Sequence, residues 1–209
     1  MPEILRTKCL GDMVKFVPYD IQYKFIASIA NEDKTISLKS RQIGFTTSSL
    51  AYSSHMLTFQ NNKTVLLYSR SEKDAAASLS ELKFMIQSLP FFLRRNELKN
   101  NEKELMLGNK RNASKIVAQT SGLQSGRSQS CTLLIIDECD YIEGVESIFK
   151  ASALTIAATN GTMVLLSTPN LYGSWFHKMI QNVRKLGKKG TGFNLIVGDW
   201  KSVPYRDQN

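Results

Sequence analysis

A strand, a glycine-ended turn and a helix follow one another in residues 34–50, and this order constrains the fold more than any other stretch. The short run 35–38, Thr-Ile-Ser-Leu, predicts a buried strand. A polar turn then ends at Gly44, and Thr46 opens an apolar-periodic segment that predicts a helix. At such a junction the first N–H groups of the helix and its positive dipole end face an anion. The stretch therefore predicts a phosphate-binding loop, and the alternative is a strand–turn–helix with no ligand.

The loop departs from the usual phosphate-loop pattern G-x-x-x-x-G-K-[ST] at two positions. Phe45 occupies the lysine position and Lys39 the position of the first glycine, while Gly44 and Thr46 fit. A lysine has a long stem and a compact charge, so from the strand end it could reach over the loop to the same phosphates. Lys39 is therefore the candidate phosphate-binding lysine.

A second predicted strand ends in paired carboxylates. The apolar run 132–136 leads directly to Asp137 and Glu138. Burying a carboxylate at a strand end is costly without a partner, and two of them make sense where a metal ion and a reacting water bind. In phosphoryl transfer a strand-end Asp holds Mg²⁺, and a neighbouring acid can orient or deprotonate water. The alternative is that both residues only cap the following helix.

Short polar residues end a third predicted strand. The apolar run 162–167 leads into Thr168, Pro169 and Asn170. Polar groups at the end of a strand beside the loop can sense a terminal phosphate, and Pro169 keeps the segment from continuing as a helix.

Near the start of the chain, Tyr19 and Gln22 lie one helical turn apart at the beginning of an amphipathic segment. A glutamine amide offers two donors and an acceptor, which can read the edge of an adenine. The alternative is a solvent-facing glutamine on the surface of the helix.

Apolar runs alternate with helix-spaced segments along the chain, which predicts an α/β fold with a mostly parallel sheet and helices on both faces. Ligands of such folds gather at the carboxyl ends of the strands. Lys39, Asp137, Glu138 and Ser167 all follow or end a predicted strand, so we expect them to lie together. The parallel strands are expected at 35–38, 64–68, 132–136, 162–167 and 193–197, with two more around a turn at 105–107 and 115–118.

The composition is that of a basic globular domain. The chain has 209 residues, which favours a single domain, and a net charge of +9, which fits a polyanionic partner. Its three cysteines lack metal-ligand spacing and are expected to be reduced thiols of an intracellular protein. The longest apolar runs fall short of the about 20 residues that cross a membrane.

Basic residues cluster in two stretches. Residues 184–189 contain Arg184, Lys185, Lys188 and Lys189 around a glycine, and we expect a flexible segment that contacts DNA. Residues 91–115 also carry many lysines and arginines, but acids are interleaved there, as on an ordinary solvated surface.

Four motifs together resemble the N-terminal ATPase domain of the large terminase subunit of tailed bacteriophages, a P-loop NTPase of the additional-strand, catalytic-glutamate (ASCE) class. Residues 19–22 resemble its adenine motif and 40–47 its Walker A motif. Residues 135–142 resemble Walker B with the catalytic glutamate, and 167–170 resemble the coupling motif. The order and spacing match over roughly residues 15–200.

The resemblance implies a DNA-packaging motor that uses ATP and Mg²⁺ to drive double-stranded DNA into a procapsid. It implies a homo-oligomeric ring, the portal protein and the small terminase subunit as partners, and a location in the host cell cytoplasm. It assigns Glu138 to catalysis with Arg41 and Lys39 beside it, and Thr46 and Asp137 to the metal. The nucleotide-binding set is Tyr19, Gln22, Lys39, Ser40, Arg41, Gln42, Ile43, Gly44, Phe45, Thr46 and Thr47, and the coupling set is Ser167, Thr168, Pro169 and Asn170.

The chain differs from this family in two ways. Phe45 replaces the common Walker A lysine, although some terminases carry that lysine at the start of the loop, where Lys39 stands. The family also continues into a nuclease domain, so we expect residues 1–209 to be a single ATPase domain without nuclease activity. An extension is expected over about 1–18 and a basic, glycine-rich tail over about 184–209. Two other functions remain open: a nucleotide-gated assembly module with little hydrolysis, and a helicase-like ATPase.

Overall fold

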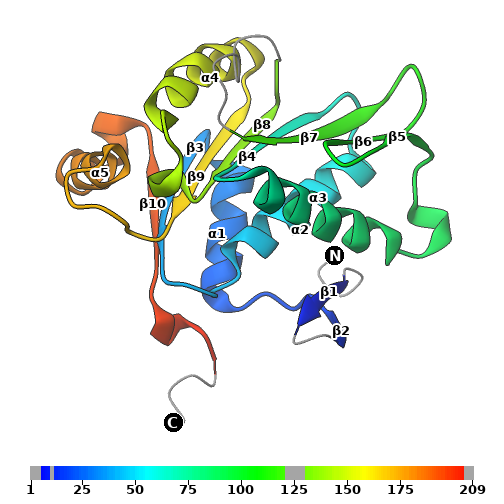
Figure 1. Ribbon diagram of the computed structural model, residues 1–209, viewed down its shortest axis with the longest axis horizontal. Helices are drawn as coiled ribbons and strands as arrows, with labels where there is room; N and C mark the ends of the chain where they lie inside the picture. The colour runs from blue at the N-terminus through cyan, green and yellow to red at the C-terminus, as the bar shows by residue number, and fades with distance from the viewer. Residues whose placement is uncertain (1–5, 10–11, 121–129, 205–209) are drawn as a thin grey trace.

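An eight-stranded sheet forms the centre of the molecule, in the order β10-β3-β9-β8-β4-β7-β6-β5 (Figure 1). The computed structural model describes residues 6–9, 12–120 and 130–204. The strands from β10 to β7 in this order are parallel, and β6 and β5 continue the sheet antiparallel. The strands are β3 Lys34–Lys39, β4 Thr64–Ser69, β5 Glu97–Asn100, β6 Glu104–Leu107, β7 Ser114–Thr120, β8 Leu133–Asp137, β9 Thr162–Ser167 and β10 Asn194–Gly198.

Helices cover both faces of this sheet, as the α/β pattern predicts. Figure 1 shows α1, α2 and α3 on one face and α4 and α5 on the other. A small hairpin of β1 Arg6–Cys9 and β2 Asp12–Lys15 lies against α3. The helices are α1 Asp20–Asn31, α2 Phe45–Phe59, α3 Glu72–Gln87, α4 Val145–Thr159 and α5 Trp175–Thr191.

The central strands are continuous apolar runs because helices bury them on both sides. All five residues of β8 are buried, and so are residues 163–167 of β9. Their side chains alternate between two hydrophobic cores, one under α1, α2 and α3 and the other under α4 and α5. Cys131 and Cys139 are buried without a disulfide, as expected, whereas the side chain of Cys9 lies outside the described residues.

The predicted fold class and the five predicted parallel strands are confirmed. The two strands expected around a turn are β6 and β7, but β7 also pairs in parallel with β4, which extends the main sheet. Residues 184–189 differ from expectation, because they belong to α5 and not to a flexible segment. Gly187, with φ 64°, interrupts that helix. Later in the same stretch, Gly198 ends β10, which pairs with β3.

The carboxyl ends of four neighbouring strands meet at one edge of the sheet. The register aligns Leu38 with Ser167 and Asp137 with Leu166, so β3, β9 and β8 end at the same level. β4 is the next strand after β8 in the sheet. Residues that follow these strands are therefore neighbours in space. No helix in the described ranges has the length and hydropathy needed to cross a membrane.

Candidate functional site

The loop between β3 and α2 is held in a conformation that an ordinary side chain would disturb. Gly44 precedes the helix with φ 75°, and Gln42 also has a positive φ of 58°. A Cβ atom at Gly44 would lie 2.3 Å from Gln22 Nε2, so both the backbone angle and the space require glycine. The base of the loop is fixed by a hydrogen bond from Ser40 N to Gly198 O, at 2.8 Å.

Gln22 supports this loop from behind. Its side chain is 5% exposed, so the solvent-facing alternative is wrong. Its Oε1 accepts a hydrogen bond from Tyr19 N at 3.0 Å, and its Nε2 donates to Ile43 O at 2.9 Å. The amide therefore joins the start of α1 to the loop. Tyr19 itself is 38% exposed at the N-terminus of α1, and an adenine contact by either residue stays a prediction.

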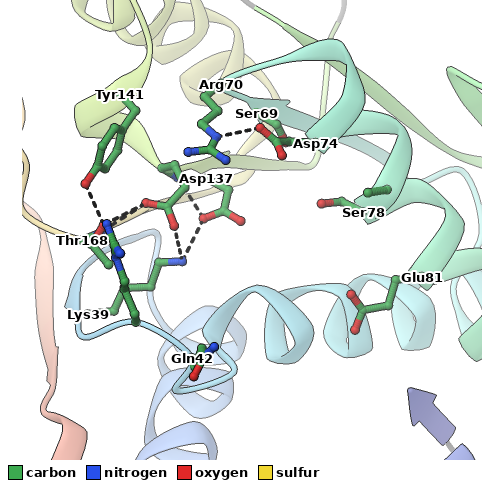
Figure 2. Close-up of a pocket in the computed structure, with 13 residues that line it drawn as sticks. Lys39, Gln42, Ser69, Arg70, Asp74, Ser78, Glu81, Asp137, Tyr141 and Thr168 are labelled. Carbon is green, nitrogen blue, oxygen red and sulfur yellow. Dashed lines mark hydrogen bonds and ion pairs between the residues drawn. The ribbon is translucent and has the colours of Figure 1, made fainter. Parts of the chain in front are cut away.

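Lys39 ends β3 and points its ammonium group at the two carboxylates. Its Nζ donates to Asp137 Oδ1 at 3.2 Å and to Glu138 Oε1 at 3.0 Å, as Figure 2 shows. Burial lowers the pKa of Lys39, but attraction to Asp137 and Glu138 outweighs this and raises the pKa above its usual value. Lys39 is therefore a charged, nearly buried group beside the loop, and phosphate binding by it stays a prediction.

The hydroxyl of Thr46, in the first turn of α2, reaches the same carboxylates. Thr46 Oγ1 donates to Asp137 Oδ2 at 2.7 Å. Lys39 Nζ also donates to Thr46 Oγ1, at 3.3 Å, so three oxygens from Thr46, Asp137 and Glu138 converge on one cationic centre. Mg²⁺ prefers oxygen ligands and is commonly held by one or two side chains together with substrate phosphates. The residues therefore fit that ion, although no group of three or more His, Cys, Asp or Glu forms a cage among the described residues.

Glu138 has an unusual backbone. Its φ and ψ of 52° and 45° place it in the left-handed region, which a glutamate adopts at a cost of about 1–2 kcal/mol. Glu138 Oε1 accepts from Lys39, and Oε2 accepts from the backbone N and Oγ1 of Thr168, both at 3.3 Å. Strained residues of this kind cluster at functional sites, and here the strain aims the carboxylate at the loop.

The segment after β9 is hydrogen-bonded to the segment after β8. Ser167 Oγ accepts from Asp140 N at 3.1 Å, and Asn170 N donates to Asp140 Oδ2 at 2.7 Å. Ser167 is fully buried, Thr168 is nearly so, and Pro169 continues to the exposed Asn170. Residues 167–170 are thus hydrogen-bonded to the segment that follows Glu138.

The side chain in the usual lysine position points into the core. Phe45 is 1% exposed, and its ring stacks on Phe25 with centroids 4.4 Å apart. Ile43 is also 1% exposed, and a Cβ at Gly198 would collide with both Ile43 and Phe45. Both residues support the loop from inside and do not face a phosphate.

We expect Phe45→Lys to destabilise the protein by about 3 kcal/mol or more in urea unfolding, because it replaces a packed ring with an unpaired buried charge. Phe59→Lys in the same helix is the matched control, since Phe59 is 43% exposed, and it should change stability little. A stable Phe45→Lys protein with raised turnover would show instead that position 45 can reach the site.

A cavity of about 550 Å³ opens in front of these groups. Arg41 and Gln42 line it from the loop. At its edge, Thr47 Oγ1 donates a hydrogen bond to Glu81 Oε1. Tyr19 and Gln22 are not among the described residues that line the cavity. The contributions of β4 and α3 were not predicted from the sequence. These are Ser69, Arg70, Asp74, Ala77, Ser78 and Glu81, and Tyr141 lines the cavity from beside Glu138. The position of Arg70 two residues after the predicted strand 64–68 was a usable signal, whereas a single glutamate within a helix gives none.

The fold is shared with solved phage proteins. No protein-family model matches the chain. The HK97 bacteriophage large terminase superposes with a TM-score of 0.72 at 19% identity, covering 94% of this chain and 42% of that one. The ATPase domain of the Thermus phage P74-26 large terminase gives a TM-score of 0.70 at 12% identity, covering 92% and 86%.

A third similar structure contains a nucleotide analogue. It is the large terminase of another thermophilic bacteriophage in complex with ATP-gamma-S, with a TM-score of 0.67 at 14% identity, covering 89% of this chain and 46% of that one. The chain therefore spans less than half of this protein and of the HK97 protein. The chain has the fold of phage large terminase ATPase domains, an α/β P-loop NTPase fold, over most of its length.

Proposed function

We propose that this chain is the ATPase domain of a phage large terminase, which hydrolyses ATP with Mg²⁺ and drives double-stranded DNA into a procapsid. The observation that carries the proposal is the convergence of Lys39, Thr46, Asp137 and Glu138 beside a loop–helix junction. The shared fold and the ATP-gamma-S complex of the thermophilic phage terminase support it.

Each group has a distinct chemical task in this proposal. The N–H groups of the loop and of the first turn of α2 bind the phosphates, and Lys39 neutralises charge on the terminal ones. Thr46 and Asp137 would hold Mg²⁺, which would supply neutralisation of phosphate charge. Glu138 accepts a proton from water as the water oxygen attacks the terminal phosphorus, and the bond from that phosphorus to the bridging oxygen breaks to release ADP.

The link from Glu138 to residues 167–170 suits a coupling role. When Glu138 takes up a proton, Oε2 becomes a poorer acceptor for Thr168 N and Oγ1. Ser167 and Asn170, on either side of Thr168, are hydrogen-bonded to Asp140 in the same segment as Glu138, so the change passes to the end of β9. This route connects hydrolysis to movement of a surface segment.

ATP turnover measured with Mg²⁺ at several protein concentrations tests the proposal. We expect the ATP turnover per molecule to rise with protein concentration, because rings form at higher concentration. Nucleotide binding without turnover, even where a ring assembles, would favour the nucleotide-gated assembly module. Strand separation on a duplex with a single-stranded tail would favour a helicase-like ATPase.

We propose that double-stranded DNA contacts α5. This helix carries basic residues on its exposed surface and has no acidic residue. They are Lys178, Arg184, Lys185, Lys188 and Lys189, and Lys188 also pairs with Glu32. A helix surface of one charge matches a polyanion. The portal protein, the small terminase subunit and further copies in a ring are the other proposed partners.

We expect the double variant Lys185→Gln/Lys189→Gln to flatten the salt dependence of DNA binding by about two units of log–log slope, one for each lost phosphate contact. The control is Lys110→Gln/Arg111→Gln, which removes two exposed cations from the turn between β6 and β7. Equal slopes for the α5 variant and the wild-type protein would place the DNA elsewhere.

A further inference from the structure

Arg70 enters the cavity from the side opposite Lys39. It follows β4 directly, and β4 lies beside β8, the strand that carries Asp137. Lys39 ends β3, which is separated from β8 by β9. The two cations therefore flank the carboxylates from opposite sides of the sheet edge, and both line the cavity with Glu138.

The Arg70 side chain is held by one of its three nitrogens. Nε donates to Asp74 Oδ2 at 2.7 Å (Figure 2), and Ser71 Oγ donates to the same Asp74 oxygen at 2.7 Å. No hydrogen bond within the described residues uses Nη1 or Nη2 of Arg70. The outer fork of the guanidinium is thus available while its orientation is set by Asp74.

Stability does not explain this arrangement. The side chains of Arg70 and Asp74 are 53% and 37% exposed, and exposed pairs of this kind add little to folding. The hydrogen bond and charge of Asp74 raise the pKa of Arg70, with a smaller contribution from Glu138 and Tyr141 across the cavity. Arg70 is therefore within electrostatic range of the proposed catalytic carboxylate.

We infer that Arg70 binds the terminal phosphate of the nucleotide through its outer fork and makes the site prefer a triphosphate over a diphosphate. The inference rests on the proposed function, because it uses the same cavity. A planar guanidinium can donate two parallel hydrogen bonds to phosphate oxygens, which lysine cannot match. The terminal phosphate must lie beside the water that Glu138 activates, and Arg70 lines the cavity on that side. Asp74 is a positioning residue that orients the fork.

The test is the affinity of the protein for ATP-gamma-S and for ADP, each with Mg²⁺, by titration calorimetry. Loss of a charge-assisted contact predicts that Arg70→Gln weakens ATP-gamma-S binding by about 10- to 100-fold and leaves ADP binding close to wild type. Arg70→Lys should recover part of the loss, because it restores the charge without the fork. Arg111→Gln, an exposed arginine outside the cavity, should change neither affinity.

Asp74→Asn separates positioning from a structural role. If Asp74 positions the Arg70 fork, Asp74→Asn should lower the ratio of ATP-gamma-S to ADP affinity, as Arg70→Gln does, but by a smaller factor. If the ratio of ATP-gamma-S to ADP affinity is the same in Arg70→Gln as in the wild-type protein, the inference is overturned, whether the two affinities are unchanged or fall together. The proposed function would still stand as long as the wild-type protein turns over ATP. A wild-type protein that binds neither nucleotide would overturn both.

Discussion

Glu138→Gln should lower ATP turnover by about 10²- to 10⁴-fold, the usual contribution of a general base, with little change in nucleotide affinity. Glutamine keeps the shape of the side chain but cannot accept a proton from the attacking water. Glu138 is 29% exposed on its side chain and already shares both oxygens with Lys39 and Thr168, so the carboxylate is preorganised for this step.

The measurement is steady-state turnover with saturating ATP and Mg²⁺, together with the ATP-gamma-S dissociation constant. Glu143→Gln provides the control, because Glu143 is an exposed glutamate five positions along the same segment and outside the cavity. Turnover by Glu138→Gln equal to that of the control would remove Glu138 from catalysis and leave Asp74 and Glu81, the acids of the cavity without a proposed metal role, as candidate bases.

The position of the candidate site residues was predictable from sequence because it depends on strand ends. Lys39, Asp137 and Ser167 each follow or end a predicted buried strand, and the carboxyl ends of parallel strands that are buried on both faces lie at one edge of the sheet. Neither the strand order nor the pairing was needed for that step. The addition of β7 beside β4 was not predictable, because it depends on pairing between segments far apart in the chain.

The directions in which individual side chains point could not be predicted from the sequence. Gln22 was expected either to read adenine or to face solvent, and the packing of α1 behind the loop excludes the second alternative, because it buries the side chain and turns its amide toward Ile43 O. Phe45 was recognised as a departure from the loop pattern, yet only the stack on Phe25 shows that it belongs to the core. Glu81 contacts Thr47 because of how α3 packs on α2, which helical periodicity does not determine.

Lys39→Met should abolish most ATP turnover, with a loss of about 10²- to 10³-fold, as for other preorganised groups that stabilise transition-state charge. It should also destabilise the protein by about 3 kcal/mol, because Asp137, with a side chain only 10% exposed, and Glu138 lose their common counter-ion. The control is Lys34→Met at the opposite end of the same strand, which should affect neither property strongly. Turnover that survives Lys39→Met would assign the phosphate contact to Arg41 or another basic group of the cavity.

Lys39 has two roles in the proposed function, and a double variant separates them. Its ammonium neutralises Asp137 and Glu138 in the structure, and it would contact the phosphates of a bound nucleotide when Thr46 and Asp137 hold Mg²⁺. Lys39→Met/Glu138→Gln removes one of the two unpaired charges, so its stability in urea should recover part of the loss seen in Lys39→Met. Turnover should not recover, because both the phosphate contact and the base are gone. Equal stability of the single and double variants would show that the ion pair with Glu138 contributes nothing to folding, and the contribution of Lys39 to stability would then come from Asp137.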